Sequence, residues 1–139
     1  MTVHAACVLI FNCTDEEILS VARKGNPNDK GLPGGSVEAG EFSLQAALRE
    51  LKEEAGIELG PYDVGDEGFI GEGRNGKEVE TFISCICKQT PFKPSEEGAV
   101  AWVPVEKILT GSFGEYNTEL LKMFSRKDAP VPTCSCTRK

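Results

Sequence analysis

Residues 35–57, GSVEAGEFSLQAALRELKEEAGI, constrain the fold of this chain more than any other segment. Within them, Glu50, Glu53 and Glu54 are spaced i, i+3 and i+4, so a helix would place them on one face. Clustered carboxylates repel one another, and each repulsion costs folding free energy. A chain keeps such a cluster most easily when a hard cation lies among the oxygens. The segment therefore predicts a loop, a helix and a second loop that together hold a divalent metal.

The expected helix covers residues 43–55. One narrow apolar stripe at helical spacing should face the core, formed by Leu44, Leu48, Leu51 and Ala55. Ser43 or Glu41 is expected to cap the start of the helix, and Gly56 to end it. The helix should therefore dock through its leucines and present its glutamates to a cleft.

The rest of the chain predicts a mixed sheet between helices. Strands are expected at residues 5–11 and 18–22, near Ser36 and Val37, and at 67–74, 77–87 and 99–103. Residues 23–30, rich in Asn, Pro and Gly, indicate a loop, and Asn75-Gly76 indicates a hairpin turn. A short helical turn at 105–109 and a closing helix at 115–124 complete an α/β domain.

Length and charge limit the remaining possibilities. The 139 residues suffice for one domain, expected at residues 1–125, followed by a mobile polar tail at 126–139. A net charge of −7 disfavours binding to nucleic acid polymers and to anionic membranes, and favours free nucleotides that carry Mg²⁺. Neither a membrane helix nor a secretory signal is evident, so we expect a cytoplasmic protein with reduced cysteines. A homodimer remains open.

The glutamate segment resembles the Nudix box, the signature of the MutT-like pyrophosphohydrolases. Every fixed position of that pattern is matched, by Gly35, Glu41, Arg49, Glu50, Leu51, Glu53, Glu54, Gly56 and Ile57. The resemblance implies an α/β/α sandwich with a mixed β-sheet. It also implies metal-dependent hydrolysis of a diphosphate linkage in a nucleoside diphosphate derivative.

The resemblance assigns roles to the residues of the box. Glu50, Glu53 and Glu54 would ligate Mg²⁺, with Mn²⁺ able to substitute, since all the candidate ligands are oxygens. We favour Glu53 as the residue that orients or deprotonates water, although members of the family differ in which carboxylate is the base. Arg49 would pair with carboxylates, Glu41 among them, and hold helix and loop together.

Other candidates lie outside the helix. One of Glu96 and Glu97 could add a catalytic or metal-binding acid, or both could be solvated loop residues. Arg23 and Lys24 are candidate phosphate contacts or ordinary surface cations. Gly34 and Gly35, in the turn at 31–35, would help to position the phosphates. The aromatic residues that could stack on a base fit core packing better; they are Phe11, Phe82 and Trp102.

Substrate identity follows from elimination only. Markers of the NADH, coenzyme A and ADP-ribose subfamilies are absent, which leaves hydrolysis of a nucleoside triphosphate, oxidised purine triphosphates included, to a monophosphate and pyrophosphate. An ADP-ribose or other nucleotide-sugar pyrophosphatase is the alternative. A non-catalytic nucleotide-sensing module is a third reading, disfavoured because all the box glutamates are present.

Overall fold

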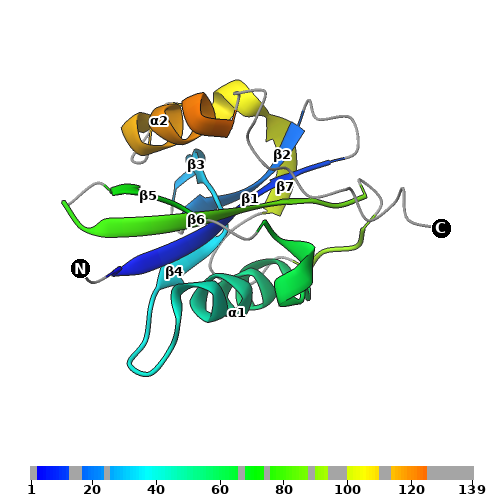
Figure 1. Cartoon of the computed structure of the whole chain (residues 1–139). Coiled ribbons are helices and arrows are strands. Elements are labelled where there is room, and N and C mark those ends of the chain that lie inside the picture. Colours follow the sequence, from blue (N-terminus) through cyan, green and yellow to red (C-terminus); the bar gives the residue numbers. More distant parts are fainter. Residues whose placement is uncertain are drawn as a thin grey trace.

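A computed structural model describes residues 3–12, 17–23, 26–65, 68–73, 76–87, 90–93, 100–109 and 114–124. These residues form a seven-stranded mixed sheet with one long helix on each face (Figure 1). The predicted α/β/α sandwich is therefore confirmed. The predicted tail at 126–139 lies outside the described residues. Within the described ranges, no helix is long and apolar enough to cross a membrane.

The elements follow one another in a simple order. They are β1 (Ala5–Phe11), β2 (Glu17–Arg23), β3 (Asn26–Gly31), β4 (Gly34–Ser36), α1 (Ser43–Ala55), the 3-10 turn η1 (Pro61–Asp63), β5 (Phe69–Glu72), β6 (Glu78–Cys85), β7 (Val100–Pro104), the 3-10 turn η2 (Val105–Ile108) and α2 (Gly114–Phe124). The main path of the sheet is β3-β2-β1-β6-β5, with β4 paired to β1 and β7 to β2. Strands β1 and β6 are parallel, and the other pairs are antiparallel.

The two faces of the sheet carry two cores because side chains alternate along a strand. In β1, Val8 and Ile10 pack in the core beneath α1, whereas Leu9 belongs to the core beneath α2. On the first face α1 contributes Leu51 and Ala55, both fully buried. On the second face α2 contributes Leu120, which is also fully buried. Both helices are thus held by apolar burial.

Most of the predicted strands are confirmed, but the loop predicted at residues 23–30 is wrong. Asn26–Gly31 forms β3, which pairs with β2 through Val21–Gly31 and Ala22–Lys30. The register shifts between Ala22 and Arg23. Strand β3 lies at the end of the main path of the sheet, and an edge strand tolerates the proline and polar residues that suggested a loop.

Helix α1 has the predicted bounds and the predicted stop. Gly56 adopts the left-handed conformation, with φ of 69°, and donates its N–H to the carbonyl of Lys52 at 2.9 Å. The predicted start is wrong, because neither Ser43 nor Glu41 caps the helix. Gln45 instead accepts the N–H of Phe42 at 2.7 Å.

Other partners explain why the expected caps are absent. The Ser43 hydroxyl donates to Glu80 Oε1 at 2.5 Å. The Glu41 carboxylate accepts the N–H of Glu38 at 2.9 Å and bonds to Arg49. Bonds that involve ionised groups are stronger than neutral ones, so these partners displace the expected cap.

One edge of strand β1 pairs with β6, and the other edge is divided between β4 and β2. Ala5, Ala6 and Cys7 pair with β4, whereas Phe11 at the other end pairs with Ile18 of β2. Residues of β1, β2 and β4 line a pocket.

Candidate functional site

Arg49, in the middle of α1, organises the predicted metal-binding helix. Its Nε and Nη2 atoms lie 2.8 and 3.1 Å from the two carboxylate oxygens of Glu41, so the pair is bidentate. Nη2 also donates to the carbonyl of Ser36 at 3.1 Å. The guanidinium hydrogen bond holds the pKa of Glu41 below its usual range, and the same bond raises the pKa of Arg49. Arg49 therefore fastens the loop before α1 to the helix.

The other amino group of Arg49 gathers two of the box glutamates. Nη1 lies 2.9 Å from Glu50 Oε1 and 3.2 Å from Glu53 Oε2. Glu38 is a fourth carboxylate, 3.6 Å from Nη2. One guanidinium thus faces four carboxylates, and the cluster retains an excess of negative charge that would attract a further cation.

Gly35 gives the carboxylate of Glu50 the room it occupies. A Cβ atom at Gly35 would lie 2.6 Å from Glu50 Cδ and 2.7 Å from Oε1. No side chain could stand there without moving the carboxylate. The open space beside Gly35 of β4 is thus the cradle that the Glu50 carboxylate occupies.

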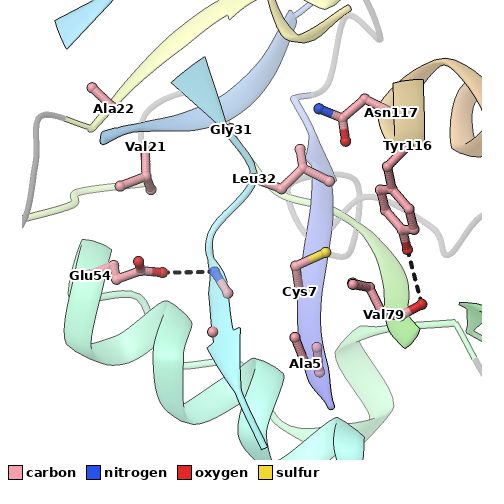
Figure 2. A pocket seen from close by; sticks show the side chains of 13 residues that line it. Ala5, Cys7, Val21, Ala22, Gly31, Leu32, Glu54, Val79, Tyr116 and Asn117 are labelled. Carbon is pink, nitrogen blue, oxygen red and sulfur yellow. Dashed lines mark hydrogen bonds between the residues drawn. The ribbon is translucent and has the colours of Figure 1, made fainter. Parts of the chain in front are cut away.

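Glu54 points to a different partner. Its Oε1 accepts the N–H of Gly34 at 2.7 Å, which joins α1 to β4 (Figure 2). Glu50 and Glu53 meet at Arg49, and no group of three or more His, Cys, Asp or Glu side chains within the described ranges is arranged to hold a metal ion. The three glutamates are neighbours on α1, but Arg49 holds the carboxylates of Glu50 and Glu53, whereas the Glu54 carboxylate bonds to Gly34.

The donor set nevertheless suits a divalent metal. Carboxylate oxygens of Glu50 and Glu53 converge on one cationic nitrogen, and a hard cation requires the same convergence of oxygens. The cradle at Gly35 leaves Glu50 free of steric crowding. Glu54 lies one residue beyond Glu53, with its carboxylate at the edge of the pocket. These residues could hold a hard cation between α1 and β4.

A pocket of about 380 Å³ begins at Glu54 and extends to α2. Strands β1, β2, β3, β4 and β6, the segment that joins β3 to β4, and both helices contribute to its lining. The lining consists of Ala5, Ala6, Cys7, Val21, Ala22, Gly31, Leu32, Gly34, Gly35, Glu54, Val79, Tyr116 and Asn117 (Figure 2). The wall is mainly apolar, with a few polar groups. Its size and lining are typical of sites for small organic ligands.

A chain of hydrogen bonds crosses one wall of the pocket. Cys7 Sγ lies 2.9 Å from Thr81 Oγ1, which lies 2.5 Å from the hydroxyl of Tyr116. That hydroxyl donates to the carbonyl of Val79 at 3.2 Å. Burial raises the pKa of the Cys7 thiol from 9.0 to about 12 and also raises the pKa of Tyr116, so both groups stay protonated at neutral pH.

The pocket residues on α2 are absent from the sequence-based prediction. The prediction treated α2 as a closing helix and weighed only its apolar residues. The usable signal was the position of Asn117, three residues before the buried Leu120 and therefore on the inward face. Asn117 is 1% exposed. A polar amide at an inward position indicates a specific hydrogen-bonding role.

Several predicted site residues cannot be placed by their side chains. Arg23 ends β2, but only its backbone is described. Lys24, Glu96 and Glu97 lie outside the described residues. Gly34 and Gly35 line the pocket beside Glu54.

The three aromatic residues pack as expected. Phe82 is a buried member of the core beneath α1, and Trp102 packs against that core. Phe11 packs against the core beneath α2.

Comparisons with known proteins agree with this geometry. The model of the NUDIX domain matches residues 1–124. The m7GpppN-mRNA hydrolase of Saccharomyces cerevisiae is 33% identical over 104 residues, which are 71% of this chain and 10% of that protein. The ADP-ribose pyrophosphatase of Methanocaldococcus jannaschii is 52% identical over 46 residues, or 31% of this chain and 27% of that protein. The chain thus spans about a tenth and about a quarter of the lengths of these relatives.

A solved structure gives a broader match. The Ap4A hydrolase of C. elegans, in a binary complex, superposes with a TM-score of 0.69 at 26% identity. The match covers 87% of this chain and 95% of that protein. The likeness therefore extends over nearly the whole of both chains.

Proposed function

The chain belongs to the NUDIX family; on that premise we propose that it is a Nudix pyrophosphohydrolase and that it hydrolyses a diphosphate linkage in a nucleoside diphosphate derivative. The observation that carries the proposal is the double position of Glu54. It belongs to the glutamate face of α1 and also lines the pocket. A substrate whose nucleoside occupied the pocket would therefore extend its phosphates toward the carboxylates.

The proposed metal is Mg²⁺, with Mn²⁺ as a substitute, since Nudix hydrolases generally use divalent metals. Glu50, Glu53 and Glu54 are the proposed ligands. When bound, the metal would neutralise phosphate charge and lower the pKa of a coordinated water. We retain Glu96 and Glu97 as candidates for an additional acid.

The residues of this chain would then have separate tasks. Arg49 holds Glu50 and Glu53 in place through its own bonds to the loop. Of the two carboxylates bound to Arg49 Nη1, that of Glu53 is more exposed than that of Glu50. With 56% of its side chain accessible, Glu53 suits the role of a residue that orients or deprotonates water. Gly34 and Gly35 would leave space for phosphates at the pocket edge, and Arg23 and Lys24 would supply positive charge.

Two substrate classes fit the proposal. The first is a nucleoside triphosphate, oxidised forms included, cleaved to a monophosphate and pyrophosphate. The second is ADP-ribose or another nucleotide sugar, and the identity of 52% over 46 residues with an ADP-ribose pyrophosphatase favours it. The names of that relative and of the Ap4A hydrolase both refer to adenine nucleotides, which makes ATP, ADP-ribose and Ap4A suitable first substrates.

Replacing Glu53 by Gln tests the assigned catalytic face. The substitution keeps the shape of the side chain and removes its charge, so we expect kcat to fall at least about 100-fold with the fold retained. Steady-state rates with Mg²⁺ give the measurement, and circular dichroism checks the fold. Glu119→Gln, on the exposed face of α2, is the matched control and should change kcat less than about twofold. A Glu53→Gln enzyme with activity within threefold of the unmodified protein would exclude the assignment.

The products identify the bond that is cleaved. Mass spectrometry after reaction in ¹⁸O-labelled water should show a nucleoside monophosphate together with pyrophosphate from a triphosphate, or ribose phosphate from ADP-ribose. Addition of EDTA should stop the reaction. Orthophosphate and a nucleoside diphosphate as the sole products would contradict the proposed linkage.

A further inference from the structure

A groove separate from the pocket lies between Val3, just before β1, and the loop that joins β4 to α1. Its volume is about 430 Å³, which is within the range of sites for small organic ligands. Figure 1 shows the loop projecting from the body of the molecule. The groove shares no lining residue with the pocket that begins at Glu54. It therefore needs an explanation of its own.

Backbone hydrogen bonds hold the loop in a defined shape. Gly40 has a positive φ of 82°, and the N–H of Glu41 donates to the carbonyl of Glu38 at 3.0 Å. The N–H of Val37 donates to the carbonyl of His4 at 2.9 Å, which joins the loop to the segment opposite. The two sides of the groove are thus fixed relative to each other before any ligand binds.

The wall of the groove is largely apolar and includes an exposed aromatic ring. Val3, Val37 and Ala39 contribute aliphatic surface. Phe42 lies beside them with 79% of its area exposed, and among the large hydrophobic side chains of the described residues only Tyr62 is more exposed. Leaving apolar surface in water is unfavourable, and the face of an aromatic ring attracts cations. Phe42 therefore indicates a surface that gains stability when a ligand covers it.

Two carboxylates give the groove a negative charge. The hydrogen bond from Arg49 holds the pKa of Glu41 below its usual range, so Glu41 is ionised. Glu38 has 67% of its side chain exposed, and its one ion pair among the described residues is the 3.6 Å contact with Arg49 Nη2, which exceeds hydrogen-bonding distance. No lysine or arginine of the described chain lines the groove. The carboxylate of Glu38 is therefore available to a cationic ligand.

We propose that this groove binds a free organic cation, an ammonium group on a short apolar chain, with the ammonium at Glu38 and the chain against Val37 and Phe42. The N–H donors of an ammonium match carboxylate oxygens, and the net charge of −7 disfavours anions. The apolar wall selects the body of the ligand, because a bare inorganic cation would bury no apolar surface there. The inference goes beyond the proposed function and does not depend on hydrolysis.

Ligands of matched length test the proposal on the unmodified protein. Hexylammonium has both the charge and the chain, 1-hexanol lacks the charge, and hexanoate has the opposite charge. NMR titration without metal or nucleotide should show hexylammonium binding at least about fivefold more tightly than hexanol, and hexanoate more weakly than either. Methylammonium, which lacks the chain, should bind at least about tenfold more weakly than hexylammonium. Equal affinities for hexylammonium and hexanol, or no shifts with millimolar hexylammonium, would overturn the proposal.

The same titration locates the ligand. The shifts of backbone amides should centre on Val37, Glu38 and Phe42. Shifts centred on Glu50 and Glu53 would instead place the amine at the carboxylates of α1 and overturn the proposal. N-acetyl-lysine amide, a mimic of a lysine in a partner protein, should bind more weakly than hexylammonium. Tighter binding of this mimic would overturn a free amine as the occupant.

Substitution of the aromatic ring assigns the effect to the groove. Phe42→Ala should weaken hexylammonium binding at least about fivefold. The melting temperature should change by less than about 2 °C, because the ring is exposed. Tyr62→Ala is the matched control, since Tyr62 is an exposed aromatic residue outside the groove, and it should retain the affinity. A Phe42→Ala protein with unchanged affinity would exclude the ring.

Substitution of the carboxylate tests the choice of charge. Glu38→Gln should bring the affinities for hexylammonium and hexanol within about twofold of each other. Glu58→Gln is the matched control, because Glu58 is also an exposed glutamate paired with a cation but does not line the groove. A Glu38→Gln protein that keeps the full preference would exclude Glu38 as the site of the ammonium.

The outcomes separate this inference from the proposed function. Hydrolysis of a nucleotide by a protein that binds no amine would leave the function standing and overturn the inference. Amine binding by a protein that hydrolyses no nucleotide would support the groove and overturn the function.

Discussion

At the scale of single residues, the position of the Glu50 carboxylate depends on the absence of a side chain at Gly35. A Cβ at this position would meet the end of a flexible carboxylate rather than the backbone. The glutamate can therefore move aside at little cost in folding free energy, but it then leaves its place beside Arg49.

We predict that Gly35→Ala weakens metal binding without lowering the stability of the fold. The melting temperature should change by less than about 3 °C. Affinity for Mn²⁺, measured by calorimetry, should fall at least about tenfold, as expected when the support of a metal ligand is disturbed.

Gly60→Ala is the control for this substitution. Gly60 has φ of −92°, and the nearest atom to an added Cβ would lie 3.5 Å away. Alanine at this position should therefore leave the melting temperature and the affinity for Mn²⁺ unchanged. Unaltered Mn²⁺ affinity in the Gly35→Ala protein would mean that the cradle does not position Glu50.

At the scale of elements, the neighbouring glycine has a different role. A Cβ at Gly34 would lie 2.4 Å from the carbonyl oxygen of Ala6 and 2.6 Å from Cys7 Cα. These are backbone atoms of β1, with which β4 pairs at this point. Gly34 is thus required for the close approach of two strands, and Gly35 for the position of a carboxylate.

We predict that Gly34→Ala destabilises the protein where Gly35→Ala does not. Forcing β4 away from β1 should lower the free energy of unfolding by about 1–3 kcal/mol, as is usual for overpacking. Urea unfolding of the two variants side by side measures the difference. Equal midpoints for the two proteins would show that the β1–β4 contact adapts without cost.

At the scale of the whole molecule, charge links metal binding to stability. The chain has a net charge of −7, and four carboxylates share one guanidinium at the site. A cation bound there would relieve the remaining repulsion in the folded state only. Binding to the folded state raises stability by mass action.

We predict that Mg²⁺ at about 100 times its Kd raises the melting temperature by roughly 5–10 °C, equivalent to about 2.7 kcal/mol. EDTA should reverse the rise, and NaCl at matched ionic strength should not reproduce it. The double variant Glu50→Gln, Glu53→Gln should lose the shift. A melting temperature insensitive to Mg²⁺ and Mn²⁺, even with a nucleotide present, would contradict the metal site.

The local parts of this molecule could be predicted from the sequence. Helix α1 has the expected bounds because its leucine spacing and Gly56 are local signals. Strand β3 was missed because its composition resembles a loop, and only pairing with β2 makes it a strand. The cap of α1 was mispredicted because Glu80, distant in sequence, engages Ser43, and because Arg49, within α1, engages Glu41.

By itself the sequence determined the family, the sandwich architecture and the glutamate helix, since these depend on motif spacing and on periodicity along the chain. Only the tertiary structure decided that Arg49 also bonds to the carbonyl of Ser36 and that Glu54 bonds to Gly34. It also decided that β1, β4 and α2 enclose a pocket with Asn117 at one end. The physical reason is that a hydrogen bond or a cavity depends on distances between segments far apart in the chain, which no local pattern encodes.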